Sequence, residues 1–437
     1  MLGQELKQFF NNQDVKFIRL AFVDMLGNLK NIAITVNEAE KAFDTGIILD
    51  SSSICGFAEE AKTDLYLKPV ESTLALMPWR ASQGTVVRFF CDILYSDGTP
   101  FKFNTRDALI AAVARAKNAG FTPKIGQECE FYLFKTDGTG EPTLVPFDSG
   151  TCFDVFPLDR GEDTRRDICV TLDEVGIRPE SSHHEGGPGQ NEIDFASAEA
   201  LTAADNFLTF KSVVRAASGN HGAYASFMPK PISRAPGSGL HLNFELLTDD
   251  GKNAFADGNK LSDTAYCFIG GIMSKIREIT AFLNPMENSY ARLGEFEAPS
   301  FVSWSKENRF QLIRVPSENG ANIRIEVRSP DPTINPYAAF ALILNAGLDG
   351  IAQKIKPLPP TDLNLEEADD LTASKYEKLP LSLKEALNLA RDSAFCSKIL
   401  GKDYVESYYR LKTEELRAYM QSADKSAHFF ENYFIRT

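Results

Sequence analysis

Residues 126–134, GQECEFYLF, carry two glutamates inside an otherwise apolar run. Side chains alternate between the two faces of a β-strand, so the pattern predicts a strand with Glu128 and Glu130 on one face. The other residues of this run are typical of a buried strand, and two carboxylates on such a strand need a compensating cation. The chain is therefore expected to fold around a sheet that faces a cation site.

Two further segments place polar side chains at a similar spacing. Residues 182–195 hold a Gly-Gly-Pro-Gly turn between Glu185 and Glu192, which is typical of a hairpin that brings two more carboxylates to one place. Residues 237–245 begin with a flexible glycine loop and continue as a strand with a polar face, formed by His241, Asn243 and Glu245. Both segments predict strands that face a shared site.

A fourth segment, residues 322–328, alternates apolar and charged residues. Arg324, Glu326 and Arg328 share the face opposite two isoleucines and a valine. Arginines in this arrangement are suited to bind phosphate or carboxylate groups. A lone Glu-x-Glu pattern is most often an ordinary strand with solvent-facing acids, but four such segments in one chain favour a common site.

The residue types of the four segments indicate which metal they would bind. Five or six carboxylates with one histidine suit hard divalent ions, Mg²⁺ or Mn²⁺, whereas zinc recruits cysteine or several histidines. Two or more ions are expected. For His183 and His184, a structural hydrogen-bonding role and a functional role both stay open. Cys129 is predicted to be a small buried residue without a chemical role, because neighbouring carboxylates raise the pKa of a thiol.

The chain changes character after its first hundred residues. Short apolar runs at residues 17–23 and 85–90, separated by Gly-Asn and Asp-Gly turn signals, predict a small strand-rich domain. From Thr105 onward, apolar residues recur three and four positions apart, which predicts a helix that ends near Gly120. A second, larger domain therefore begins near this point.

Further helices are predicted in the larger domain, at residues 168–175, 203–214 and 261–279 and from Pro336. The polar-faced strands lie between these helices, so the predicted fold class is α+β, with an antiparallel sheet backed by helices. The proline-rich and acidic residues from 357 to 370 predict a surface excursion before a helical C-terminal region.

The composition disfavours several classes of protein. The chain has 46 basic and 60 acidic residues and a net charge of −14, which argues against nucleic acid or an anionic membrane as a partner. It has no apolar run of about 18 residues, and its N-terminus has no basic segment followed by an apolar one. The seven cysteines are widely spaced and include no Cys-x-x-Cys pair, so a cytoplasmic location is predicted.

Motifs for common nucleotide and nucleophile sites are missing from the sequence. It contains no Gly-x4-Gly-Lys-Ser/Thr loop, no Gly-x-Gly-x-x-Gly, no His-Glu-x-x-His and no Gly-x-Ser-x-Gly. If ATP is a substrate, it is therefore not held by a P-loop.

The four segments, in this order, resemble those of type I glutamine synthetases over nearly the whole chain. Other similar segments are 49–57 (LDSSSICGF), 157–159 (PLD), 227–231 (FMPKP), 288–293 (NSYARL), 297–299 (EAP), 308–309 (NR) and 335–337 (NPY). The resemblance implies a β-grasp-like N-terminal domain over residues 1–103 and a catalytic domain over residues 104–437. It also implies a homo-oligomer, usually a dodecamer of two rings, with each active site between neighbouring subunits.

The resemblance assigns roles to individual residues. It implies one metal ion at Glu130, Glu185 and Glu192 and a second at Glu128, His241 and Glu326. The amino-acid substrate would be held by Gly237, Arg292 and Arg328, and the phosphates and nucleotide by Arg309, Arg314, Arg324, Asn243 and Glu180. Catalytic roles fall to Arg309, to Glu297 on a closing flap, and to Asp50 of the adjacent subunit, which binds ammonium with Ser53 nearby.

The implied reaction is the ATP-dependent ligation of ammonia to the γ-carboxylate of L-glutamate. A carboxylate is a poor electrophile, so ATP first converts it to γ-glutamyl phosphate, and metals and arginines neutralise the charge on the transferring phosphoryl group. This intermediate hydrolyses in water, which explains the need for a flap. Attack by ammonia gives glutamine, ADP and phosphate, with ATP as co-substrate and two or more Mg²⁺ or Mn²⁺ ions per site.

Three residues depart from the family pattern: Pro236, Cys152 and Glu245, and one residue is missing between Arg292 and Glu297. A smaller side chain at 152 enlarges the amine site, and proline at 236 removes a hydrogen-bonding side chain from the glutamate site. The alternative function is therefore a γ-glutamyl-amine ligase that uses a polyamine or a small primary amine.

Two other classes of function stay open. A catalytically silent relative would be expected to have lost metal ligands, whereas here all six matching positions hold competent residues. A phosphotransferase that stops at the phosphorylated acid would not need Asp50 and Glu297.

Overall fold

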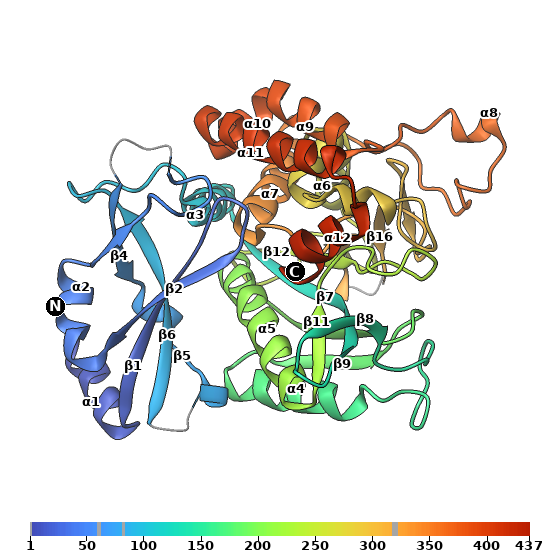
Figure 1. The fold of residues 1–437 in the computed structure, drawn as a ribbon. Coiled ribbons are helices and arrows are strands. Elements are labelled where there is room, and N and C mark those ends of the chain that lie inside the picture. The colour runs from blue at the N-terminus through green and yellow to red at the C-terminus, as the bar shows by residue number, and fades with distance from the viewer. Residues whose placement is uncertain (1, 59–62, 81–83, 317–321) are drawn as a thin grey trace.

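The computed structural model describes residues 2–58, 63–80, 84–316 and 322–437. Within these residues a six-stranded sheet occupies the first hundred positions and a nine-stranded sheet organises the remainder (Figure 1). The predicted α+β class, with a small strand-rich N-terminal part and a helix-backed sheet in the second part, is confirmed.

The first sheet has the strand order β2-β1-β6-β4-β3, with β5 paired to β6. Strands β1 and β6 are parallel, and the other pairs are antiparallel. Helix α1 packs against this sheet through its buried residues Leu6 and Phe10, and the ring of Phe10 contacts that of Phe89. The elements are α1 (Gln4–Asn12), β1 (Val15–Val23), β2 (Leu29–Thr35), α2 (Ala39–Asp44), β3 (Ile47–Asp50), β4 (Asp64–Pro69), β5 (Ala75–Leu76) and β6 (Thr85–Leu94).

The second sheet has the order β15-β16-β17-β12-β7-β10-β9, with β8 and β11 also paired to β7. Its strands are antiparallel, as predicted, except for the parallel edge pair β15 and β16. The strands are β7 (Phe121–Thr136), β8 (Pro142–Pro146), β9 (Pro179–His184), β10 (Gln190–Glu199), β11 (Ala223–Ser226), β12 (Leu240–Thr248), β15 (Trp304–Lys306), β16 (Ile313–Val315) and β17 (Ile325–Val327), with a separate hairpin of β13 (Ala256–Asp257) and β14 (Lys260–Leu261).

The helices predicted from apolar spacing are all present, and α3 and α5 pack against β7. Helix α7 is buried over most of its length and is capped by Asn335, whose side chain accepts hydrogen bonds from the next turn. The helices of this part are α3 (Thr105–Asn118), α4 (Glu162–Glu174), α5 (Ala200–Asn220), α6 (Asp263–Leu283), α7 (Pro336–Gln353), α8 (Asp370–Ala373), α9 (Leu383–Asp392), α10 (Ala394–Leu400), α11 (Lys402–Gln421) and α12 (Lys425–Phe429).

The two sheets are joined by one continuous hydrophobic core and by buried polar contacts. Arg106, at the start of α3, lies 3.0 Å from Asp205 on α5 and 3.7 Å from Asp92 on β6. The Tyr404 hydroxyl donates to the carbonyl of Met25 at 2.8 Å. The predicted domain boundary, between residues 103 and 104, falls in the segment that connects β6, which ends at Leu94, to α3, which begins at Thr105. The exact position of the boundary stays a prediction.

The loop that carries α8 extends away from the body of the molecule (Figure 1). It follows the proline-rich stretch, so the predicted surface excursion is confirmed. Of the helices in the described part of the chain, none has both the length and the apolar character needed to cross a membrane.

Candidate active site

A cleft of about 900 Å³ opens over the second sheet, where β7, β10, β12 and β17 lie side by side. Most of the residues singled out from the sequence line it. They are Glu128, Glu130, Glu185, Glu192, Gly237, His241, Arg292, Glu297, Arg309, Arg314, Arg324 and Arg328. The structure therefore brings the four polar-faced segments to one place.

The strand register explains why so many acids meet in this cleft. On β7 and β10, Glu130 lies directly opposite Glu192, and Glu128 lies opposite Asp194. On the other side of β7, Glu128 faces His241 of β12. Like charges directly opposite one another destabilise a sheet. The arrangement therefore calls for positive charge from outside the sheet.

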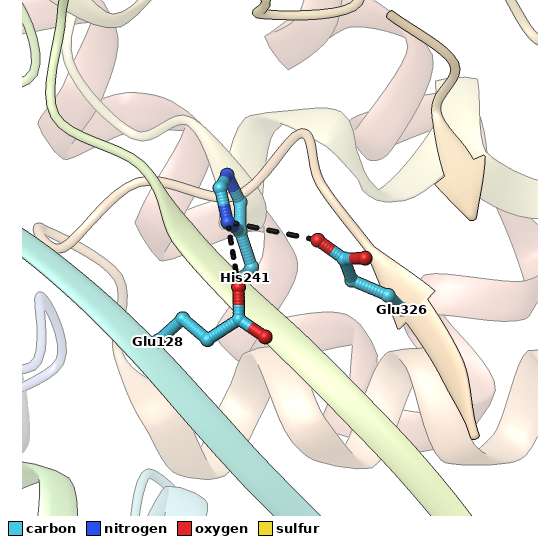
Figure 2. Close-up of side chains that lie close together, drawn as sticks. All are labelled: Glu128, His241 and Glu326. Atoms are coloured by element: carbon cyan, nitrogen blue, oxygen red, sulfur yellow. Dashed lines mark hydrogen bonds and ion pairs between the residues drawn. The ribbon is translucent and has the colours of Figure 1, made fainter. Parts of the chain in front are cut away.

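The first acidic group combines Glu128, His241 and Glu326 from three neighbouring strands (Figure 2). Nδ1 of His241 lies 3.3 Å from Glu128 Oε2 and 3.7 Å from Glu326 Oε1. One ligand atom from each residue lies within 4.8 Å of the other two. These are the three residues that the sequence assigned to one metal ion.

The second acidic group adds a histidine to residues that the family resemblance assigns to one metal ion. Glu185 and Glu192 are grouped with His183, whose Nε2 lies 2.8 Å from Glu185 Oε1. Glu130 lines the same cleft, but its Oε2 accepts hydrogen bonds from the side chain of Gln190 at 3.1 Å and from the Gly239 N–H at 2.9 Å. His183 thus lies beside Glu185 and Glu192, and Glu130 stays a predicted ligand in the same cleft.

Sequence reasoning assigned no role to Asp194, which forms a third group with Glu128 and Glu192. The signal was present, because Asp194 follows Glu192 at the same spacing of two that pairs Glu128 with Glu130. By contrast, the neighbouring His184 is buried and lies 2.9 Å from Asp148 and 2.7 Å from the Glu185 carbonyl. These contacts of His184 fix the backbone at the end of β9, next to Glu185.

The titration behaviour of the acids divides them into two kinds. Burial and the neighbouring carboxylates raise the pKa of Glu192 well above its ordinary value, and burial also raises the pKa of Glu130. Burial opposes ionisation of Glu128 too, but hydrogen bonds from His241 and Asn243 lower its pKa to about 2. Buried carboxylates that raise one another's pKa fit a hard divalent cation with oxygen ligands, so this donor set suits Mg²⁺ or Mn²⁺.

Arginines form the opposite wall of the cleft. Glu326 is fully buried and accepts hydrogen bonds from Arg314 at 2.9 Å and from Arg328 at 2.5 Å. The other amino group of Arg328 lies 3.8 Å from Glu297 Oε2. A cleft with acids on one wall and arginines on the other is suited to an anionic substrate bound together with cations.

Arg292 is buried and held by the main chain. It donates to the carbonyls of Ser329 at 2.9 Å and Arg328 at 3.1 Å. The glycine loop packs directly against it, because a Cβ on Gly237 would lie 2.8 Å from Arg292 Cγ and one on Gly239 would lie 2.5 Å from an Arg292 amino group. Only glycine fits at these two positions without moving Arg292.

A smaller recess of about 230 Å³ adjoins the cleft and shares Glu128 and Arg324 with it. It contains the remaining residues that the sequence placed near the nucleotide, Glu180 and Asn243, and it also contains Glu245. Asn243 donates to Glu128 at 2.8 Å, which couples the recess to the first acidic group.

Asp50 and Ser53 are the two predicted site residues that this chain brings into neither the cleft nor the recess. Both are exposed at the end of β3 in the first sheet, and neither is among the described residues that line the cleft or the recess. The backbone N–H of Ser52 donates to Asp50 at 2.9 Å and lowers the pKa of Asp50. Asp50 therefore carries its negative charge away from the cleft of its own chain.

Cys152 and Pro236, two of the residues that depart from the family pattern, lie next to the second acidic group. Sγ of Cys152 lies 3.6 Å from Glu185 Oε2, and burial together with this carboxylate raises the pKa of Cys152 to about 11. A Cβ built on Gly186 would lie 3.3 Å from Pro236 and 3.6 Å from Cys152. These two residues therefore form one wall of the cleft. Cys129, in contrast, is fully buried, as predicted.

Replacing Glu192 with glutamine is expected to raise the stability of the metal-free protein at about pH 7, by roughly 1–2 kcal/mol. In the folded protein the pKa of Glu192 is raised, so its contribution to stability becomes less favourable as the pH rises from the unfolded pKa through the folded value. Glutamine does not ionise, and Mg²⁺ should stabilise this variant less than the wild type.

Thermal unfolding in EDTA and in Mg²⁺, across this pH range, checks the prediction. Glu199→Gln serves as the control, because Glu199 is an exposed residue of the same strand outside the cleft. Equal stabilisation of wild type and Glu192→Gln by Mg²⁺ would contradict it.

Comparison with protein families identifies two matching regions. Residues 14–96 match the family described as glutamine synthetase, beta-Grasp domain, and residues 102–430 match glutamine synthetase, catalytic domain. Among curated proteins, the chain is 44% identical over 418 residues to a glutamine synthetase of Clostridium saccharobutylicum, with 94% of each chain covered. It is also 44% identical over 422 residues to that of Methanosarcina mazei, with 95% of this chain and 94% of the relative covered.

Solved structures show the same architecture. A GmaS/ADP complex superposes with a TM-score of 0.87 at 30% identity, covering 96% of this chain and 97% of the other. GmaS without ligand superposes with a TM-score of 0.86 at 29% identity, covering 98% and 99%. The likeness extends over nearly the whole of this chain.

Proposed function

Since this chain belongs to the glutamine synthetase family, we propose that it is the ligase that forms glutamine from L-glutamate, ammonia and ATP, through γ-glutamyl phosphate. The observation that carries the proposal is the meeting of the acidic groups with the arginines in one cleft. Acids that bind divalent cations and arginines that bind anions are what transfer of a phosphoryl group to a carboxylate requires.

The acids of the cleft would hold two or more Mg²⁺ or Mn²⁺ ions. Glu128, His241 and Glu326 would hold one ion, and Glu130, Glu185 and Glu192 a second, with His183 and Asp194 close to the second. Bound there, the ions neutralise negative charge on the phosphoryl group that leaves ATP.

The remaining side chains would bind and orient the two substrates. Arg292, Arg328 and the glycine loop at Gly237 would hold glutamate, because they line the cleft next to the acids. Arg309, Arg314 and Arg324 would face the phosphates, and the recess with Glu180 and Asn243 would take the nucleotide. The ADP complex of GmaS, which shares the fold, supports nucleotide binding on this scaffold.

The amine step would use residues from two subunits. Glu297 lies on the rim of the cleft, whereas Asp50 and Ser53 are exposed on the first sheet. A neighbouring subunit would therefore supply Asp50 to bind ammonium and remove its proton, with Ser53 beside it. This arrangement fits a ring assembly, and we infer a dodecamer of two rings built from domains at residues 1–103 and 104–437.

All seven cysteines are free, which supports a cytoplasmic location.

Phosphate release by the purified protein with Mg-ATP and glutamate tests the proposed function. Ammonium is compared with a panel of primary amines, and the products are identified by mass. Glutamine is expected as the dominant product. ATP turnover without any amide product would point to a phosphotransferase instead. No phosphate release with any amine would mean either that the acid substrate is not glutamate or that the protein is a catalytically silent relative.

The position of Cys152 favours a γ-glutamyl-amine ligase as the second candidate. Its short side chain lies beside Glu185 on a wall of the cleft that includes Pro236, and a short side chain at this position suits a nucleophile larger than ammonia. If a polyamine or a small primary amine is the preferred nucleophile, Cys152→Tyr should lower kcat/KM for that amine about tenfold more than for ammonium. Cys152→Ser is the matched control and should leave the preference unchanged.

A further inference from the structure

Lys230 is a buried cation to which the proposed function gives no role. It lies in the segment Phe227–Pro231, and its backbone is fixed because its N–H donates to Asn288 Oδ1 at 2.7 Å and its carbonyl accepts from Asn288 Nδ2 at 3.1 Å. The side chain is only 4% exposed. Lys230 is also not among the described residues that line the cleft. Lys230 is therefore a buried lysine with a fixed backbone, next to the cleft but not part of its lining.

Within the described part of the chain, no group accepts a hydrogen bond from Nζ of Lys230. Burial lowers the pKa of this lysine, Glu295 opposes the shift, and Arg292 adds to it. A buried ammonium without a partner is costly, so a group that compensates the charge should be close. The group in contact is the ring of Phe296, whose centroid lies 4.7 Å from Nζ.

Phe296 occupies the tip of a closed loop on the rim of the cleft. The N–H of Gly294 donates to the carbonyl of Ala298 at 3.0 Å, and the N–H of Ala298 donates to that of Glu295 at 3.1 Å. Between these bonds Glu295, Phe296 and Glu297 are exposed, and Phe296 has a φ of 56°. A left-handed backbone is unfavourable for an aromatic residue, so other contacts must hold Phe296 there.

The contact between Lys230 and Phe296 accounts both for the buried ammonium and for the left-handed backbone of Phe296. An ammonium over an aromatic face is attracted by the negative face of the ring, and this attraction is strongest where water is excluded. Phe296 covers the ammonium from the cleft side, since Phe296 lines the cleft and Lys230 does not. The next residue, Glu297, lies 3.8 Å from Arg328. The ring and the carboxylate are therefore placed by the same short loop.

We propose that Lys230 is a positioning residue for the Glu295–Glu297 loop. Its ammonium holds the ring of Phe296 on the cleft rim, and this contact sets the position of Glu297 beside Arg328. The consequence for catalysis rests on the proposed function, because a loop that is held in place keeps water from γ-glutamyl phosphate until the amine attacks.

Hydrogen exchange of the loop amides tests the contact without reference to activity. Lys230→Met and Phe296→Leu should each speed exchange at residues 294–298 about three- to tenfold, and the double variant should exchange no faster than either single one. Lys230→Arg keeps the cation and should restore slow exchange. Phe296 is exposed, so Phe296→Leu is informative even if Lys230→Met fails to fold.

The amount of amide formed per ATP cleaved tests the consequence. Both single variants should lower this ratio about three- to tenfold while KM for ATP stays unchanged, whereas Lys230→Met would change neither the ratio nor the exchange if Lys230 had no influence on the loop. Lys378→Met is the matched control, since Lys378 lies 4.6 Å from the ring of Phe301 outside the cleft.

The outcomes separate the two proposals. Independent, multiplying effects of Lys230→Met and Phe296→Leu on exchange, or no effect of Phe296→Leu, would overturn the positioning role of Lys230. A wild-type protein that makes no glutamine would overturn the proposed function, and the exchange result would still decide the role of Lys230.

Discussion

Replacing Glu326 with alanine is expected to lower glutamate-dependent phosphate release about 10³-fold. This carboxylate is fully buried and lies 3.7 Å from His241 in the first acidic group. It also accepts hydrogen bonds from Arg314 and Arg328. The substitution therefore removes a proposed metal ligand and leaves two arginines without the carboxylate that fixes their orientation.

A folding defect must be separated from this loss of activity, because breaking a buried ion pair costs about 3–5 kcal/mol. Glu326→Gln keeps the volume and one acceptor oxygen, so it should unfold closer to the wild-type temperature and still fail in phosphoryl transfer. Melting temperature and oligomer mass are measured for both variants, with Glu199→Gln as the active control. A folded Glu326→Ala protein that still releases phosphate would remove Glu326 from the metal site.

Replacing Asp50 with asparagine is expected to lower glutamine formation about 10²-fold and to spare most glutamate-dependent ATP cleavage. Asparagine keeps an oxygen that can accept the N–H of Ser52, so the loop at the end of β3 should not change. What is lost is the charge that would bind ammonium and take its proton. Equal loss of both activities would argue against an ammonium role for Asp50.

Mixing subunits tests whether Asp50 acts in a neighbouring cleft. Asp50→Asn and Glu326→Ala subunits are each expected to be inactive, but a hybrid ring contains sites that combine an intact Asp50 with an intact Glu326. Random mixing should restore about a quarter of wild-type glutamine formation if the two residues come from different subunits. Asp64→Asn, opposite Asp50 on β4, is the control. No recovery after reassembly would place both residues in one subunit's site.

Local patterns in the sequence predicted most of the elements that build the cleft. The spacing of two in β7 placed Glu128 and Glu130 on one face. The Gly-Gly-Pro-Gly turn predicted the hairpin in which Glu192 lies on β10 and Glu185 follows directly after β9. Apolar spacing predicted α3, α5, α6 and α7, because each of these helices buries one face against its neighbours. These are properties of side-chain direction within one element, and periodicity reports them directly.

The grouping of side chains across elements could not be predicted in the same way. His183 joins Glu185 and Glu192, while the side chain of Gln190 and the Gly239 N–H hold Glu130. Asp194 enters the site because the register of β7 and β10 places it opposite Glu128. Register depends on pairing between distant segments, and a shift of one residue would move each of these side chains to the other face.

By itself, the sequence determined the family, the fold class and the chemical character of the site, because these depend on residue types and their spacing along the chain. Tertiary structure alone decided which acids share a ligand position and that Asp50 lies outside the cleft of its own chain. It also decided that Lys230 lies beneath Phe296. These contacts join residues far apart in the chain, where strand register and loop packing set distances that no local pattern encodes.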